Sequence, residues 1–144
     1  MVEVEKQRRI KCMEIKDNYK KIKTFRDLIA WQEGHSFVLM IYETTKDFPR
    51  EEVFGLTSQL RRAIVSCTSN VAEGFSRLTP NDKAHFYTMA LGSLTEVQSQ
   101  LEIAKDIGYI EINNYNELEL KAIKIHKVLN GLIKGTRFKK FLNS

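Results

Sequence analysis

Residues 54–77, with the sequence FGLTSQLRRAIVSCTSNVAEGFSR, constrain the fold most because they carry two opposite stripes at helical spacing. At 100° per residue, one side is apolar and consists of Val53, Leu56, Leu60, Ile64, Cys67, Val71 and Leu78. The other side is polar and consists of Gln59, Arg62, Ser66, Ser69, Asn70, Glu73 and Arg77. This pattern predicts an amphipathic helix whose apolar side faces a core.

The polar stripe of this helix has two interpretations. It holds no Lys and is mixed with small residues, a composition that suits close packing or a specific contact. The alternative is an ordinary solvated face with one i,i+4 ion pair between Glu73 and Arg77. The sequence alone leaves both interpretations open.

Four segments of the chain have helical spacing and helical length. We expect the helices to span roughly residues 25–47, 50–78, 80–107 and 113–133. Thr79 is a suitable N-cap for the third helix, Pro80 suits its first position, and Gly108 provides its stop. No segment alternates with period two for long, so strands are not expected. The short connections predict an all-α, antiparallel up-down-up-down four-helix bundle.

The first of these helices is apolar on nearly all sides. We assign its core stripe to Leu28, Trp31, His35, Val38, Leu39 and Tyr42. The opposite side also carries large apolar side chains, namely Ile29, Phe37, Met40 and Ile41. Because a four-helix bundle has no central helix, we expect this second side to form the interface of a homo-oligomer. Periodicity does not give the number of copies.

The composition fits one domain, since 144 residues with 42% hydrophobic content can bury a core. No apolar run approaches the length of a membrane span, and the N-terminus is charged where a signal peptide is apolar. We therefore expect a cytoplasmic protein that does not contact a membrane. Cys12 and Cys67 are too few and too far apart for a disulfide framework, and Cys67 lies on a core stripe as a structural thiol.

The net charge of +5 is concentrated at the two ends of the chain. Residues 1–23 hold eight Lys/Arg and four Asp/Glu, and residues 134–144 hold four Lys/Arg and no acid, which leaves −3 in between. We therefore divide the chain into a basic N-terminal extension (1–23), a four-helix bundle (24–133) and a basic C-terminal tail (134–144). Basic arms of this kind suit phosphate backbones. The alternative is that they only aid solubility.

The sequence carries no recognisable catalytic or metal-binding motif. The three His residues fall on different predicted helices, and there is no phosphate-binding glycine loop or nucleophile elbow. We expect no catalysis, no metal and no cofactor. Instead, Asn70, Glu73 and Glu96 are expected to form a buried polar network. In this network Glu96 needs Arg62, Arg77 or a helix terminus as its partner, within the subunit or across an interface. A hydrolase that uses Glu73 or Glu96 is the remaining catalytic alternative.

Five motifs follow one another between residues 24 and 133. They are F-x-D-L-x-x-W-Q from Phe25, F-P-x-E from Phe48, F-G-L-T-x-Q-L-R-R-A from Phe54, S-N-x-A-E-G-F-x-R from Ser69 and G-S-L-x-E from Gly92. In these motifs the chain resembles the small four-helix-bundle proteins encoded in intervening sequences of bacterial 23S ribosomal RNA genes. The resemblance implies that fold and a homopentameric ring. Both are also similar to accessory variability determinant proteins of diversity-generating retroelements, which the resemblance associates with RNA and a reverse transcriptase.

These features predict a non-enzymatic, homo-oligomeric RNA-binding protein. The contacts to nucleic acid are assigned to Arg61, Arg62, Arg77, Lys134, Arg137, Lys139 and Lys140. Arg61 points off the polar stripe and is expected to be more exposed than Arg62. A ring of five copies would multiply weak phosphate contacts into avidity. The alternative is a protein-interaction scaffold, such as an accessory subunit of a larger complex, that does not bind nucleic acid directly.

Overall fold

The computed structural model describes residues 1–8 and 21–142, with side chains described as far as Phe138. This part of the chain contains helices and no strand, which confirms the all-α prediction for the described residues. Its long helices are α2 (Ile29–Thr45), α3 (Leu56–Ser76), α4 (Pro80–Asp106) and α5 (Ile112–Leu142). Two short 3-10 helices, η1 (Phe25–Asp27) and η2 (Arg50–Glu52), precede α2 and α3, and residues 2–8 are also helical. None of the helices in the described ranges has the length and apolar character needed to cross a bilayer.

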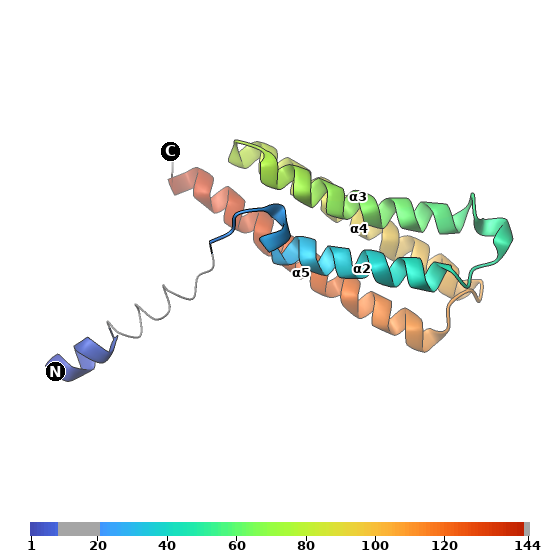
Figure 1. Cartoon of the computed structure of the whole chain (residues 1–144), viewed down its shortest axis with the longest axis horizontal. Helices are drawn as coiled ribbons and strands as arrows, with labels where there is room; N and C mark the ends of the chain where they lie inside the picture. The colour runs from blue at the N-terminus through green and yellow to red at the C-terminus, as the bar shows by residue number, and fades with distance from the viewer. Residues whose placement is uncertain (9–20, 143–144) are drawn as a thin grey trace.

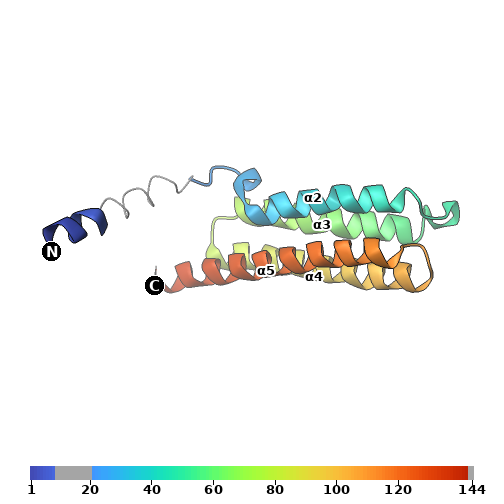
Figure 2. The same ribbon diagram turned by 90° about the horizontal axis from the view of Figure 1, so that it is seen from below.

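The four long helices lie side by side, and each runs antiparallel to the helix before it (Figure 1). Seen from below, α2 and α3 form one layer and α4 and α5 form the other (Figure 2). The contact between α3 and α4 is the most extensive, and α2 packs on both α3 and α5. The buried apolar side chains lie between these helices and form one core.

The boundaries of α4 are those that the sequence predicts. The backbone N–H of Asp82 donates to Oγ1 of the N-cap Thr79 at 3.1 Å, and Pro80 occupies the first turn. The helix ends before Gly108, whose φ of +88° lies in the left-handed region that favours glycine. These local signals depend only on neighbouring residues, which is why the sequence alone identifies them.

The two stripes of α3 are also confirmed over the length of the helix. Leu60, Ile64, Cys67 and Val71 are almost completely buried, with at most 1% of each residue exposed. Burial raises the pKa of the Cys67 thiol to about 12, as expected for a structural cysteine. Val53 and Leu78 were wrongly included in the core stripe, because they lie outside α3 and are 50% and 96% exposed. The helix begins later than predicted because residues 50–55 form η2 and a turn.

The predicted faces of α2 are wrong in part, since Leu28 is buried and Trp31 and Val38 pack against the core as predicted. Its buried residues are Ala30, Gly34, Phe37, Ile41 and Thr45, which recur at spacings of four and three. Phe37 and Ile41 are 0% exposed within the single chain, so they belong to the core and not to an oligomer interface. Met40 is partly buried against the core, and only Ile29 of the predicted interface is exposed. Leu39, Tyr42 and His35, which were assigned to the core, lie on the exposed side.

The reason for this error is that the buried side of α2 is marked by small residues. A Cβ at Gly34 would lie 2.9 Å from Cγ2 of Thr68, so glycine allows α2 to approach α3 closely. Thr45 is buried because its hydroxyl donates to the carbonyl of Ile41 at 2.7 Å. An assignment based on large apolar side chains does not detect a side that contains glycine and threonine.

The last helix continues further than predicted. α5 passes through Gly131 and Gly135 to Leu142, so residues 134–142 are helical and continuous with the rest of the molecule. Both glycines lie on the exposed side, whereas Ile133 and Thr136 are 6% and 9% exposed. Burial on one side therefore maintains the helix despite the low helix propensity of glycine.

α3 and α4 approach each other closely at Gly74. A Cβ at this position would lie 2.7 Å and 2.9 Å from ring atoms of Tyr87 and 2.9 Å from Cβ of Phe86. Gly74 is buried and Tyr87 is 2% exposed, so the Tyr87 ring cannot move without disturbing the core. Glycine is therefore required here by packing.

We predict that Gly74→Ala lowers the free energy of unfolding by about 1–3 kcal/mol, because the added methyl group overpacks the contact with Tyr87. Gly92→Ala is the matched control, since a Cβ at Gly92 in α4 meets no heavy atom within 4 Å. The control should be stabilised by about 0.5–1 kcal/mol through helix propensity. Urea denaturation measures both, and equal effects of the two substitutions would contradict the packing argument.

An ion-pair cluster links α2 to α5. Glu33 accepts hydrogen bonds from Nζ of Lys121 at 2.5 Å and from Nζ of Lys124 at 3.0 Å. The side chains of Glu33 and Lys121 are only about one-fifth exposed, at 20% and 19%. The hydrogen bonds from Lys121 and Lys124 hold the pKa of the Glu33 carboxyl below its usual value of 4.5.

We predict that Glu33→Gln lowers the free energy of unfolding at pH 7 by about 1–2 kcal/mol. Because the pKa of Glu33 is lower in the folded than in the unfolded chain, this contribution is present above about pH 4.5 and is lost as the pH falls through the folded pKa. Denaturation experiments should therefore show that the free energies of unfolding of the wild type and the variant differ less at pH 3 than at pH 7. Glu43→Gln is the control in the same helix, since the pair of Glu43 with Lys46 is largely exposed. A difference that is the same at both pH values would contradict the prediction.

Candidate functional site

A surface groove with a volume of about 850 Å³ runs between the C-terminal half of α2, η2 and the first two-thirds of α3. Its lining residues are Tyr42, Thr45, Lys46, Phe48, Pro49, Arg50, Val53, Thr57, Ser58, Arg61, Arg62, Val65, Ser66 and Ser69. The groove forms because the chain reverses direction between α2 and α3, which brings the end of one helix beside the start of the next (Figure 1). Short hydroxyl side chains of α3 leave space along its wall.

The charges of this groove have one sign. Four cationic side chains line it, from Lys46, Arg50, Arg61 and Arg62, and none of its lining residues carries a carboxylate. The side chains of Arg50 and Arg62 are exposed and have no hydrogen-bond or ion-pair partner in the described part of the chain. Lys46 pairs with Glu43 at 2.9 Å, but both side chains are largely exposed and the pair is weak. The groove can therefore attract an anionic ligand.

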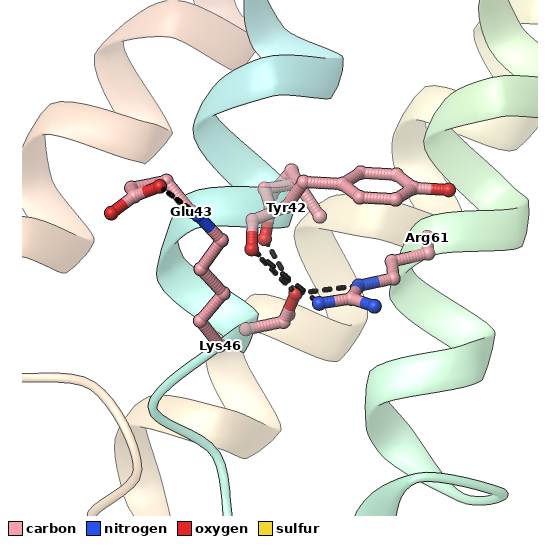
Figure 3. Close-up of polar contacts among 6 residues, drawn as sticks. Tyr42, Glu43, Lys46 and Arg61 are labelled. Atoms are coloured by element: carbon pink, nitrogen blue, oxygen red, sulfur yellow. Dashed lines mark hydrogen bonds and ion pairs between the residues drawn. The ribbon is translucent and has the colours of Figure 1, made fainter.

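Arg61 is held in place, in contrast to its neighbour. Its Nε donates to Oγ1 of Thr45 at 2.9 Å, and a terminal guanidinium nitrogen donates to the carbonyl of Tyr42 at 3.5 Å. Its guanidinium carbon lies 4.6 Å from the centre of the Tyr42 ring, a cation–π contact (Figure 3). These acceptors lie in the last turn of α2, where a cation is also favoured by the helix dipole. The expectation that Arg61 is more exposed than Arg62 is wrong, because these contacts cover it.

The other predicted nucleic-acid contacts lie at the opposite end of the molecule. Arg77 follows the last residue of α3, where it pairs with Glu73 at 2.9 Å and packs 4.3 Å from the centre of the Phe86 ring. Sixteen residues of helix place Arg77 about 24 Å from Arg61. The C-terminal turns of α5 lie at the same end as Arg77 (Figure 1).

Of the predicted contacts in α5, Lys134 and Arg137 are exposed. The side chains of Lys139 and Lys140 lie outside the described residues. The structure thus divides the predicted basic residues between two regions, the groove and the end of α3 and α5.

The predicted polar network is separated into three local contacts. Asn70 donates to the carbonyl of Ser66 at 2.9 Å, Glu73 pairs with Arg77, and Glu96 accepts from Gln100 at 3.1 Å. The proposed pairing of Glu96 with an arginine is wrong, because Glu96 is exposed and needs no buried partner. The polar stripe of α3 does make a close contact with α4, since the hydroxyls of Ser66 and Ser93 are 3.1 Å apart.

Neither carboxylate of the alternative hydrolase hypothesis lines the groove, since Glu73 and Glu96 are both absent from its wall. Within the described residues, no group of three or more His, Cys, Asp or Glu side chains is placed to hold one metal ion.

Several groove residues are absent from the predicted site, among them Tyr42, Lys46 and Arg50. The sequence pattern places Tyr42 on the core side of α2, whereas the structure places it on the exposed side. Lys46 and Arg50 lie in the connection between two helices, where periodicity gives no direction. Arg62, Ser66 and Ser69 of the predicted polar stripe do line the groove.

These observations define an all-α protein of antiparallel helices with a cationic groove beside α3. A family model described as 23S rRNA-intervening sequence protein matches residues 26–131, most of the chain. The chain therefore belongs to the 23S rRNA-intervening sequence protein family, as the five motifs indicate. The similarity to accessory proteins of diversity-generating retroelements stays a prediction.

The fold is similar to that of a solved structure, a protein with unknown function from the S23 ribosomal protein family of Bacteroides thetaiotaomicron. The TM-score is 0.67 at 21% sequence identity, over 74% of this chain and 99% of that chain. At this identity the comparison supports the fold alone. No curated protein matches the chain.

Proposed function

We propose that the protein is a non-enzymatic, homo-oligomeric RNA-binding protein that acts in the cytoplasm, and that α2–α5 form the four-helix bundle of each subunit. The observation that carries this proposal is the groove between α2 and α3, with four cationic side chains and no acidic one. Lys and Arg side chains bind phosphate backbones by releasing condensed counterions. The family name, which refers to 23S rRNA, agrees with an RNA ligand.

The second basic region supports the same proposal. Lys134 and Arg137 are exposed at the end of the molecule where α3 also ends. About 24 Å along α3 separates Arg61 in the groove from Arg77, and Lys134 and Arg137 lie on α5 at the same end as Arg77. In a ring of five copies, the number that the family resemblance implies, the contacts of all subunits would add to the avidity.

The oligomer is better supported by α4 than by α2. Met89, Ile103 and Ile107 are 36%, 50% and 53% exposed along one helix. The neighbouring Gln100 is only 7% exposed, and its side-chain oxygen is the one buried polar atom without a partner among the described residues. A second copy packed on α4 would cover these exposed apolar side chains.

We predict that affinity for single-stranded RNA falls steeply with salt and that the groove residues set this dependence. Arg62→Gln and Arg50→Gln should each reduce the slope of log K against log salt by about 0.7, the value for one phosphate contact. Lys127→Gln is the matched control, because Lys127 is exposed on α5, away from the groove. Fluorescence anisotropy at several salt concentrations measures the slopes, and a salt-insensitive affinity would contradict the proposal.

The contribution of the second region is tested separately. Deletion of residues 134–144 would remove part of α5 and the buried Thr136, so substitution is preferable. Lys134→Gln together with Arg137→Gln should flatten the salt slope further while the helix content, measured by circular dichroism, stays unchanged. Removal of residues 1–23 tests the N-terminal extension in the same assay.

We predict that the wild type sediments as an oligomer at micromolar concentration and that Ile103→Glu lowers its mass. The charge would be buried at the interface that we propose on α4. Leu78→Glu is the control, since Leu78 is 96% exposed in the connection between α3 and α4. A wild type that is monomeric at this concentration would contradict the homo-oligomer.

The exposed apolar side chains of α4 also favour a second candidate function, a protein-interaction scaffold without direct contact to nucleic acid. The partner would then be a different protein on the same side of α4. A protein partner that stays bound after nuclease treatment, together with no measurable RNA affinity, would support this alternative.

A further inference from the structure

We propose that the groove between α2 and α3 binds an unpaired nucleotide of RNA, whose base stacks on Tyr42 while Arg50 and Arg62 contact the flanking phosphates. This inference rests on the proposed function and specifies the class of RNA. It assigns a role to Tyr42, which the electrostatic argument does not use.

Tyr42 is an exposed aromatic side chain in the wall of a cationic groove. The residue is 40% exposed, and its hydroxyl has no hydrogen-bond partner in the described ranges of the chain. In the close-up, its ring extends from α2 toward α3 and lies over the guanidinium of Arg61 (Figure 3). Aromatic side chains in a cationic groove are the platforms on which single-stranded nucleic acids stack their bases. A base stacked on this ring would cover the apolar surface that is now exposed.

The orientation of the Tyr42 ring is fixed before any ligand binds. Arg61 packs on the ring, and Arg61 is itself fixed by the hydroxyl of Thr45 and the carbonyl of Tyr42. Thr45 is 3% exposed and is anchored by its bond to the carbonyl of Ile41. Since a fixed ring loses little side-chain entropy when a base stacks on it, this arrangement favours binding. Arg61 is therefore a positioning residue, whereas Arg50 and Arg62 remain available to phosphates.

The combination of an aromatic ring and cations selects an unpaired strand. The faces of bases in a duplex are covered by their neighbours, whereas unpaired bases can stack on aromatic side chains. Proteins that bind single strands combine these two elements, a cationic groove and aromatic platforms. The volume of about 850 Å³ lies in the range of sites for small organic ligands, the scale of about one or two nucleotides.

The test compares Tyr42→Leu and Tyr42→Phe in the full chain. The ligands are a uridine decamer and a decamer of abasic ribose phosphate. We expect Tyr42→Leu to weaken binding of the uridine decamer by about 5- to 150-fold, as for loss of one stacked base, with an unchanged salt slope. Tyr42→Phe keeps the ring and should bind like the wild type. On the abasic decamer all three proteins should bind equally.

Three results would overturn the inference. The first is that Tyr42→Leu and the wild type bind the uridine decamer with equal affinity. The second is that Tyr42→Phe binds the uridine decamer as weakly as Tyr42→Leu does. The third is that Tyr42→Leu loses as much affinity for the abasic decamer as for the uridine decamer. If Tyr42→Leu has no effect but Arg62→Gln weakens binding, the groove binds phosphates only, and the proposed function stands without base stacking. If the wild type binds no RNA, both proposals are wrong.

A second measurement does not depend on the folding of a variant. Wild-type protein is irradiated with a decamer that contains 4-thiouridine, and the crosslinked peptide is identified by mass spectrometry. We expect the crosslink in the peptide that contains Tyr42. Crosslinks confined to α4 or to the last turns of α5 would overturn the assignment of the base to this groove.

Discussion

The close contact between α3 and α4 at Gly74 is the constraint on which the rest of the structure depends. Because the ring of Tyr87 occupies the space of a side chain at Gly74, the two backbones approach each other and fix the position of α3. α3 is the helix that serves both the core and the groove. Its apolar side, with Leu60 and Ile64, packs inward, while Arg62 lies on the exposed side. The core packing that holds α3 in place therefore also holds the cationic wall of the groove in place.

The second wall of the groove is supplied by α2, and one side chain connects the two walls. Arg61 of α3 donates to Thr45 and Tyr42 of α2, so it joins two helices whose own backbones make no such bond at this point. The sequence places two arginines side by side, but the structure gives them different tasks. One holds the groove together, and the other, Arg62, remains available to a ligand.

The sequence predicts most of the fold because α3 has one apolar and one polar side and because local capping signals, Thr79 and Gly108, mark the ends of α4. It fails for α2, where large apolar side chains occur on all sides and the buried side includes Gly34, which only a close neighbour explains. The candidate site is predicted in part, through Arg62. Tyr42 could not be identified, because its position depends on which side of α2 faces the core.

The unequal lengths of the helices make the two ends of the molecule different. α2 has 17 residues and α5 has 31, so α5 is about 21 Å longer than α2. The start of α2, the end of α3 and the last turns of α5 lie at the same end (Figures 1 and 2). In a closed ring with its axis parallel to the helices, every subunit would present this end to one rim. One rim would then carry the chain ends with their positive charge, while the grooves would form a separate belt nearer the other rim.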